Sequence, residues 1–297
     1  MRRRRHVGSY PRRPGQEGGE ILIGKAFRKL YFGPFMRPWR WPDDVDRTRW
    51  TPITIPRGRT HLVGLLGAAD HRDLGAVVRK PPLGTVVLAH PATVAAKGFW
   101  LRRGHAELFR KLGYDVIVFD FNGWGESPPV AIDFPTDLIA VGQYAKARAP
   151  ERPVIGVGTS FGAGHLLCTL ALPEHPYSAV VAEAPWYSLP SYWRPYLPQY
   201  LVMKLSQVLY PRMERRQRPI RAMGRLRNAP HVLLVHGDLD EVAAPKISRK
   251  LLAAARGAAR AELWDVPNAG HNDALKASPE AYAERVGGFL GQALLVR

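Results

Sequence analysis

The sequence has one cysteine, no long apolar run and comparatively few acidic residues. The single cysteine, Cys168, excludes an internal disulfide framework and a zinc site built from cysteines. No stretch approaches the ~20 consecutive apolar residues that a membrane-spanning helix needs. The N-terminal arginines are not followed by an apolar segment long enough for a secretory signal. We therefore expect a cytoplasmic protein without signal peptide or transmembrane helix, with a peripheral position at a membrane as the alternative.

The deficit of acidic residues is concentrated in two segments. The chain has 43 Lys and Arg against 25 Asp and Glu, a formal charge of +18. Residues 1–50 hold 13 basic and 5 acidic residues, residues 186–230 hold 9 and 1, and all others hold 21 and 19. The body of the protein is thus nearly neutral, which disfavours a nucleic-acid-binding fold with charge spread over its core elements.

Residues 1–49 are predicted to form a basic N-terminal extension. Residues 1–20 are rich in arginine, proline and glycine, which predicts a disordered arm. Residues 20–32 carry apolar side chains at helical spacing, with lysine and arginine away from them, which predicts a short amphipathic helix. Such a helix would pack on the domain surface or lie in a membrane interface.

From residue 50 to 297, short apolar runs typical of strands alternate with helical patterns. This alternation predicts an α/β fold with a mainly parallel sheet and helices on both faces. A 45-residue insertion at about 186–230, aromatic and basic, interrupts it. The expected strands are 51–56, 61–66, 85–89, 116–119, 154–157, 179–182, 231–235 and 261–266, and the expected helices are 99–112, 136–148, 162–172, 246–256 and 279–295.

The most specific motif is a Gly-x-Ser-x-Gly turn at residues 158–162. A strand-type run precedes it and an apolar helical pattern follows it. Such a turn forces Ser160 into a strained conformation, and small residues are needed around it because a Cβ would collide with the strand and helix. The hydroxyl is lifted above the sheet edge at a helix N-terminus. We interpret Ser160 as a nucleophile rather than as part of an ordinary tight turn.

A serine nucleophile needs a base and an acid that orients the base, and both are expected after later strands. His271 lies in a loop after the last expected strand, and His236 directly follows the strand before it. Asp240 ends the turn after that penultimate strand and is the natural orienting acid. The order Ser160, Asp240, His271 fits a nucleophile turn of this type. Competing acids are Asp238, Glu241 and, after the strand that follows the nucleophile, Glu183.

Five motifs occur in an order that resembles the α/β-hydrolase superfamily over residues 50–297. They are His90-Pro91, residues 120–127, residues 158–162, residues 236–240 and residues 270–273. The last motif is similar to the Bem46-like and serine-aminopeptidase-like branch, which includes monoacylglycerol-lipase-like esterases. The resemblance implies Ser160 as nucleophile, Asp240 as acid and His271 as base. It also implies that the insertion at 186–230 is a cap over the site.

The remaining candidate site residues follow from the expected turn geometry and from the cap that the resemblance implies. The oxyanion hole should use the N–H of Phe161 and an N–H from the loop after residue 89; Pro91 has none, so Ala92 is expected before Thr93. His90 is expected to brace this loop and to border the substrate pocket. Trp186 and Tyr187, at the start of the insertion, are further candidate pocket residues. No metal or organic cofactor is expected.

These residues predict a serine hydrolase that cleaves a carboxylic ester or thioester through an acyl-enzyme on Ser160. The alternatives are a serine peptidase or amidase of the same fold, and a non-catalytic binding protein. The expected partners are a small-molecule acyl substrate and, through the basic arm and cap, an anionic membrane surface. Nucleic acid is not an expected partner, because the charge lies outside the body of the domain.

Overall fold

The computed structural model describes residues 39–70, 81–130, 133–188, 190, 194, 197–209 and 211–295. The amphipathic helix predicted at residues 20–32 lies outside the described residues. Residues 39–49, assigned above to the N-terminal extension, pack on the domain: Trp39, Trp41 and Val45 are partly buried against one of its two apolar clusters. No described helix is long and apolar enough to cross a membrane.

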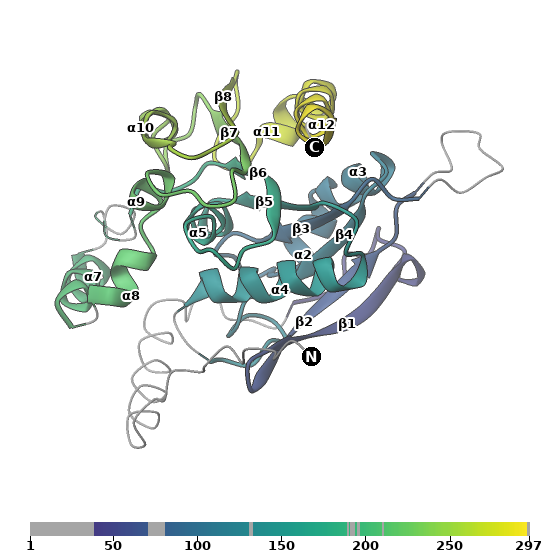
Figure 1. Cartoon of the computed structure of the whole chain (residues 1–297), viewed down its shortest axis with the longest axis horizontal. Helices are drawn as coiled ribbons and strands as arrows, with labels where there is room; N and C mark the ends of the chain where they lie inside the picture. The colour runs from purple at the N-terminus through teal and green to yellow at the C-terminus, as the bar shows by residue number, and fades with distance from the viewer. Residues whose placement is uncertain are drawn as a thin grey trace, which may run out of the picture.

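The described residues form one eight-stranded sheet of order β1-β2-β4-β3-β5-β6-β7-β8 (Figure 1). β2 pairs antiparallel with β1 and β4, and the pairs from β4 to β8 are parallel. The fold class predicted from the alternation of strands and helices is confirmed. The strands are β1 (Trp50–Arg57), β2 (Thr60–Gly67), β3 (Thr85–Ala89), β4 (Asp115–Phe119), β5 (Val154–Thr159), β6 (Tyr177–Glu183), β7 (His231–Gly237) and β8 (Arg260–Val266).

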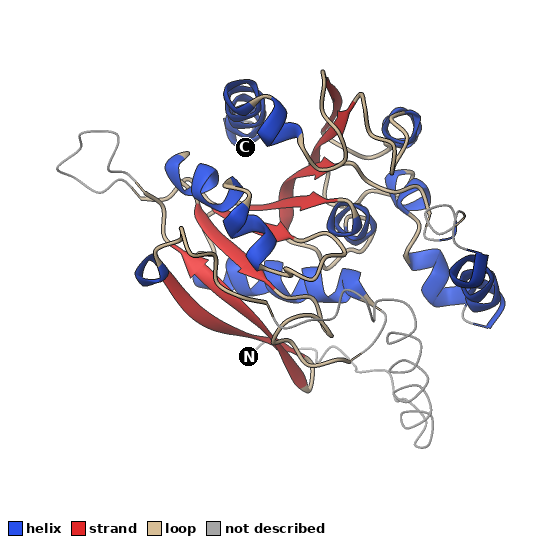
Figure 2. Cartoon of the chain, turned by 180° about the vertical axis from the view of Figure 1, so that it is seen from behind, coloured by secondary structure: helices blue, strands red, loops and turns tan. Residues whose placement is uncertain are grey.

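Helices cover both faces of this sheet, because successive side chains of a strand point to opposite sides. In β3, for example, Val86 and Leu88 belong to one apolar cluster, and Val87 and Ala89 belong to the other. Helices α4 (Phe134–Arg148), α5 (Phe161–Thr169), α9 (Pro219–Met223) and α10 (Lys246–Ala254) contribute to the first cluster. Helices α2 (Gly98–Arg102), α3 (His105–Lys111), α11 (Ala274–Ala277) and α12 (Pro279–Leu295) contribute to the second. Figure 2 shows the same layers from behind.

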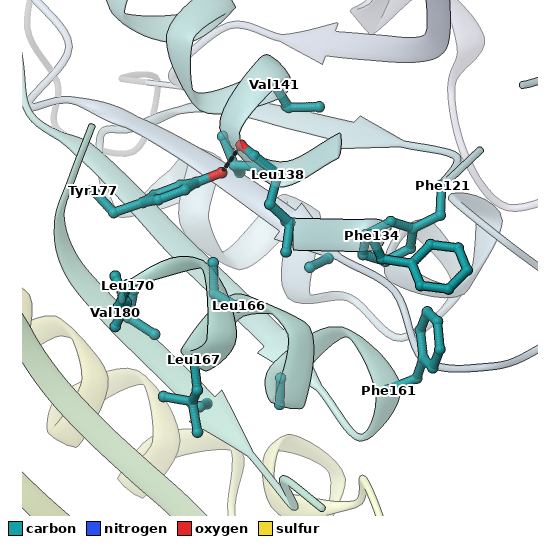
Figure 3. Packing of buried hydrophobic residues seen from close by; sticks show 14 of the residues in the cluster. Phe121, Phe134, Leu138, Val141, Phe161, Leu166, Leu167, Leu170, Tyr177 and Val180 are labelled. Atoms are coloured by element: carbon teal, nitrogen blue, oxygen red, sulfur yellow. Dashed lines mark hydrogen bonds between the residues drawn. The ribbon is translucent and has the colours of Figure 1, made fainter. Parts of the chain in front are cut away.

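Three aromatic rings pack together where α4, α5 and the loop after β4 meet (Figure 3). The ring centroids of Phe121 and Phe134 are 5.8 Å apart, and Phe161 lies 5.6 Å from Phe121 and 5.0 Å from Phe134. Nearby, the Tyr177 hydroxyl donates to the Leu138 carbonyl at 2.6 Å, which ties β6 to α4. Removal of one such buried ring typically costs about 3–5 kcal/mol. This packing fixes the residue that follows Ser160.

The structure differs from the helix predictions in two segments. The helix expected at 99–112 is two helices, α2 and α3, because Gly104 takes the left-handed conformation with φ 77° between them. The insertion at 186–230, for which no helix was predicted, contains α7 (Leu197–Leu209), α8 (Pro211–Arg216) and α9. α7 and α8 lie beyond α9 at one side of the molecule in Figure 1.

The strand order reverses beside β3. The chain passes from β3 to its neighbour β4 and then to β5 on the other side of β3. In open α/β sheets such a reversal opens a crevice outside the carboxyl ends of the strands, where ligands bind. The loops that begin at His90 and at Ser160 follow β3 and β5, so both border this crevice.

Candidate active site

Ser160 sits in a strained turn between β5 and α5, with φ 50° and ψ −114°. Small neighbours are required, since a Cβ at Gly162 would lie 2.1 Å from the Ala89 carbonyl oxygen and one at Gly158 would lie 2.8 Å from the Ala163 nitrogen. A residue held in such a region costs about 1–3 kcal/mol and persists only where its surroundings enforce it. The packing of α5 against the end of β3 provides that enforcement.

The structure brings Ser160, His271 and Asp240 together from three different loops. The Nε2 atom of His271 lies 3.0 Å from the Ser160 hydroxyl oxygen. Its Nδ1 atom lies 2.8 Å from Oδ2 of Asp240. In the tautomer that carries its proton on Nδ1, His271 donates a hydrogen bond to Asp240. Its Nε2 can then accept the proton of the serine hydroxyl, as a general base must.

Asp240 is held by a network that the sequence analysis did not anticipate. Its Oδ1 accepts the backbone N–H groups of Val242 and Ala243 at 2.9 and 2.8 Å. His236 approaches Oδ2 at 3.3 Å, and its own ring is fixed by Ser248 and the Ala243 carbonyl, each at 2.6 Å. Burial acts to raise the pKa of Asp240, but the hydrogen bonds from His236 and His271 outweigh it and hold that pKa well below its usual range.

The competing acids lie elsewhere. Asp238 and Glu241 are exposed, whereas Asp240 is buried. Glu183 is buried and accepts the Ala274 N–H at 3.0 Å, three residues beyond His271. Burial raises the pKa of Glu183 to about 7. Of the four carboxylates considered, Asp240 is the one in contact with the imidazole of His271.

Further contacts fix the loop that carries His271. The Thr159 hydroxyl donates to the Asn272 side chain at 2.5 Å, which joins this loop to the end of β5. Arg103 donates to Asp273 at 2.8 Å from the turn between α2 and α3. Together with the bond from Ala274 to Glu183, these contacts hold His271 in register with Ser160. The Asn-Asp pair after His271 was visible in the sequence, but its partners were not.

The candidate oxyanion donors follow β3 and β5, the two neighbouring strands at the reversal of strand order. Phe161 directly follows Ser160, and its N–H is at the first turn of α5. In the loop after β3, the Thr93 N–H already donates to the Pro91 carbonyl at 2.8 Å. Within the described part of the chain we find no such acceptor for the Ala92 N–H, which makes Ala92 the better candidate of the two.

His90, Trp186 and Tyr187 have different surroundings. His90 is fully buried: its Nδ1 donates to the Pro91 carbonyl at 2.8 Å and its Nε2 accepts the Phe121 N–H at 3.2 Å. Burial lowers the pKa of His90 to about 4. These contacts suit loop bracing and leave no ring nitrogen for a substrate. Trp186 is also buried, and its Nε1 donates to the Phe161 carbonyl at 3.3 Å. Tyr187 borders an open cleft.

The turn at residues 120–127 is built around a buried ion pair. The ammonium of Lys97 lies 2.6 Å from Asp120 and 2.5 Å from Glu126. Asp120 also accepts the backbone N–H of Lys97 and of Glu126. This network connects the loop after β3 to the turn after β4. Sequence reasoning missed Lys97, because no motif marks a lysine whose partners come from a distant loop.

The sequence matches the model of a known protein family. The family model described as serine aminopeptidase, S33, matches residues 80–231, about half of the chain. The chain belongs to the serine aminopeptidase family, S33. Membership in this S33 family confirms the α/β-hydrolase resemblance drawn from the five motifs. The S33 match begins just before β3 and ends at the start of β7, so it contains Ser160 and the segment between β6 and β7.

Individual relatives of this S33 chain match over shorter regions. A lysophosphatidylserine lipase, ABHD12, of Gallus gallus is 33% identical over 109 residues, which cover 33% of this chain and 29% of that protein. An uncharacterized protein of Mycobacterium tuberculosis is 30% identical over 166 residues, or 54% of each protein. The chain thus matches less than a third of the length of the curated lipase and about half of the mycobacterial protein.

Solved structures share the fold at low identity. A Pyrococcus furiosus esterase superposes with a TM-score of 0.65 at 20% identity, over 88% of this chain and 97% of that chain. Est1E from Butyrivibrio proteoclasticus gives a TM-score of 0.60 at 16% identity, over 82% of this chain and 99% of that chain. At these identities the likeness establishes a common architecture for the S33 chain and these proteins.

Proposed function

We propose that this protein is a lipase- or esterase-like serine hydrolase that cleaves acyl esters or thioesters through an acyl-enzyme on Ser160. The observation that carries the proposal is the pair of contacts from Ser160 to His271 and from His271 to Asp240, at 3.0 and 2.8 Å. They lie at the carboxyl ends of the strands, beside the strand-order reversal. A strained serine, a histidine and a buried carboxylate in this order form the constellation that activates a serine hydroxyl.

In the first step, His271 Nε2 takes the hydroxyl proton as Ser160 Oγ attacks the acyl carbonyl carbon. The tetrahedral oxyanion accepts hydrogen bonds from the N–H groups of Phe161 and Ala92. Asp240 stabilises the imidazolium and keeps its orientation. The leaving alcohol or thiol then takes the proton from His271, and the acyl group stays bonded to Ser160.

In the second step, His271 removes a proton from water as the water oxygen attacks the acyl-enzyme carbonyl. The same oxyanion donors act again. The bond to Ser160 Oγ breaks, the serine recovers its proton from His271, and the carboxylic acid leaves. No atom of this cycle requires a metal ion or organic cofactor.

Acyl ester substrates are also supported by the relatives. The ABHD12 proteins are named as lysophosphatidylserine lipases, and their match to this chain is 33% identical in the chicken protein. We therefore place esters first, thioesters second, and the peptidase or amidase reaction last. A substrate panel with one acyl group as p-nitrophenyl ester, thioester and anilide separates these reactions. Faster turnover of the anilide than of the ester would overturn the esterase assignment.

The direct test of the nucleophile is Ser160→Ala with p-nitrophenyl butyrate as substrate. We expect kcat to fall by at least about 10³-fold, because no acyl-enzyme can form. Ser178→Ala, at a serine near the start of β6 and so at the opposite end of the sheet, is the matched control and should retain wild-type turnover. Unchanged turnover in Ser160→Ala would exclude the mechanism.

We further propose that the segment at 186–230 is a cap that meets an anionic lipid surface together with the basic residues before position 39. α7 supports this proposal, because five of its apolar residues are each more than half exposed, although Met203 on the opposite face is buried. Exposed arginines of α8, such as Arg212 and Arg215, follow it directly. An apolar stripe beside basic residues is the composition that suits an anionic bilayer interface. The exposed residues are Leu197, Leu201, Leu205, Val208 and Leu209.

Vesicle co-sedimentation tests this lipid surface. Vesicles of phosphatidylcholine with about a quarter phosphatidylglycerol should bind the protein, with weaker binding as salt rises, because surface charges are screened. Leu205→Gln with Val208→Gln should reduce binding, and Leu83→Gln, an equally exposed leucine outside the cap, should not. Equal binding to pure phosphatidylcholine vesicles, or no loss in the α7 variant, would contradict the proposal.

A further inference from the structure

A cleft of about 560 Å³ lies between the start of the cap segment and helices α7 and α9. Its lining is strongly basic, and no Asp or Glu is among the lining residues that the structure describes. Two tyrosines, Tyr187 and Tyr200, add hydroxyl groups to the wall. The cationic lining residues are Arg194, Lys204, Arg218 and Arg221.

Among the described residues, three of these four cations have no acidic neighbour. Glu214 pairs with Arg218 and also accepts a hydrogen bond from Gln207, so one cation of the cleft is neutralised. For Arg194, Lys204 and Arg221, no carboxylate within 4 Å was found in the described part of the chain. Like charges that share a cleft repel one another, so their arrangement is favourable only with an anion between them or with solvent screening.

The chain segment that begins the cleft wall is anchored beside the proposed active site. Tyr187, in its wall, follows Trp186, whose indole donates to the carbonyl of Phe161 beside Ser160. Ile220, which lines the cleft on α9, also packs against the apolar cluster that contains Phe161. We therefore expect a substrate whose acyl group lies at Ser160 to place its polar part against the basic wall.

We propose that this cleft binds a phosphate group of the substrate, so that the preferred substrates are acyl esters that carry a phosphate monoester or diester. The inference rests on the esterase function proposed above. Arginine presents paired N–H donors that match two phosphate oxygens, and lysine adds a compact charge. The tyrosine hydroxyls can donate to the remaining oxygens. The phosphate belongs either to a lipid headgroup or to a soluble phosphate ester.

The first experiment compares 1-butyrylglycerol 3-phosphate with uncharged 1-butyrylglycerol, both in solution without vesicles. The wild type should prefer the phosphate ester in kcat/KM. In Arg221→Gln and in Lys204→Gln the ratio of the two kcat/KM values should fall about tenfold, as expected for one charge-assisted contact. Arg225→Gln removes an exposed arginine outside the cleft and should leave the ratio unchanged. A ratio that is unaltered in both cleft variants with the butyryl substrates, and equally unaltered with the oleoyl substrates described next, would overturn the proposal.

A second arm identifies the source of the phosphate. 1-Oleoylglycerol 3-phosphate in neutral detergent micelles replaces the butyryl ester. Loss of preference in the cleft variants with the oleoyl substrate alone identifies a lipid headgroup, and loss with both substrates identifies phosphate esters in general. Either result supports a phosphate site.

Direct binding separates failure of the cleft from failure of the esterase assignment. Titration calorimetry of Ser160→Ala with glycerol 3-phosphate needs no turnover, and the heat should disappear in Ser160→Ala combined with Arg221→Gln and Lys204→Gln. Binding without any esterase activity in the wild type would contradict the proposed function and leave the phosphate site supported. Esterase activity with no binding and no preference for the phosphate ester would contradict the phosphate site alone. Melting temperatures of all variants establish that they fold.

Discussion

The body of the domain buries its apolar side chains and pairs its buried charges, whereas the segment between β6 and β7 exposes apolar side chains and carries cations that face an open cleft. Every residue of β3 is buried, and the ammonium of Lys97 is buried beside two carboxylates. In the segment between β6 and β7, Val208 of α7 is 76% exposed, and Arg194, Lys204 and Arg221 line an open cleft. The body therefore holds its side chains in fixed contacts, whereas this segment, the proposed cap, presents groups that a ligand or a surface can still satisfy.

This difference predicts that substitutions in the body change chemistry or stability strongly, and that substitutions in the cap change affinity for anions. The predictions below begin with the largest expected effect.

Asp240→Asn should lower kcat for p-nitrophenyl butyrate by about 10³- to 10⁴-fold. Val242 and Ala243 donate to one oxygen of Asp240, so the new amide N–H₂ must face His271. His271 then has to accept at Nδ1 and carries its proton on Nε2, where it cannot take a proton from Ser160. Steady-state kinetics measures the loss. Asp238→Asn, an exposed carboxylate two residues away, should stay near wild type, and equal losses in both variants would contradict the assigned role.

Gly162→Ala should destabilise the fold by about 3 kcal/mol, because the new methyl would meet the backbone of Ala89 and His90. Urea unfolding followed by circular dichroism measures this change. Gly288→Ala in α12 is the control: its Cβ would meet nothing within 4 Å, so the better helix propensity should stabilise by about 0.5–1 kcal/mol. A fully stable Gly162→Ala protein would show that the turn around Ser160 is less tightly packed against Ala89 and His90 than the structure indicates.

Glu183→Gln should change the pH dependence of stability. Burial raises the pKa of Glu183 to about 7 from a usual value of 4.5. Because the folded state binds this proton more tightly, the contribution is present below pH 4.5 and is lost as pH rises through 7. Glutamine stays neutral and still accepts the Ala274 N–H, so the variant should gain on the order of 3 kcal/mol relative to wild type between pH 4.5 and 8.

Urea unfolding at several pH values measures the Glu183 effect. A constant difference between variant and wild type at all pH values would mean that Glu183 does not titrate in this range. Its control is Glu280→Gln, at the start of α12, where the side chain is exposed.

Arg215→Gln should have the smallest effect. Arg215 is an exposed residue of α8, and such substitutions usually change stability by less than about 0.5 kcal/mol. Turnover of a soluble uncharged ester should not change. Affinity for anionic vesicles should fall about fivefold, the usual contribution of one basic residue near a charged surface. A large change in soluble esterase activity would contradict the separation between body and cap.

The sequence predicted the parts of the site that depend on local chain geometry. The glycines around Ser160 and the apolar runs before it predicted a strand, a turn and a helix, and β5 and α5 are found there. The order of Ser160, Asp240 and His271 singled out three residues that the structure brings together. Their roles in catalysis stay a prediction until the variants above are measured.

Other features depend on contacts between distant segments, which a single sequence does not reveal. His236 was considered as a base, but in the structure it approaches Asp240 and so supports the acid. Lys97 meets Asp120 only because the loops after β3 and β4 are adjacent. α7 was missed although its exposed apolar residues recur at helical spacing. The basic cleft appears only when Arg194, Lys204 and Arg221 converge from separate parts of the cap.

The measurement that tests the central claim most directly is active-site labelling with a fluorophosphonate, followed by mass spectrometry of the modified peptide. We expect one label per chain, attached to Ser160, and almost none in His271→Ala, because the serine is then without its base. Labelling at another serine, no labelling of the wild type, or equally fast labelling of His271→Ala would contradict the account of Ser160 as an activated nucleophile.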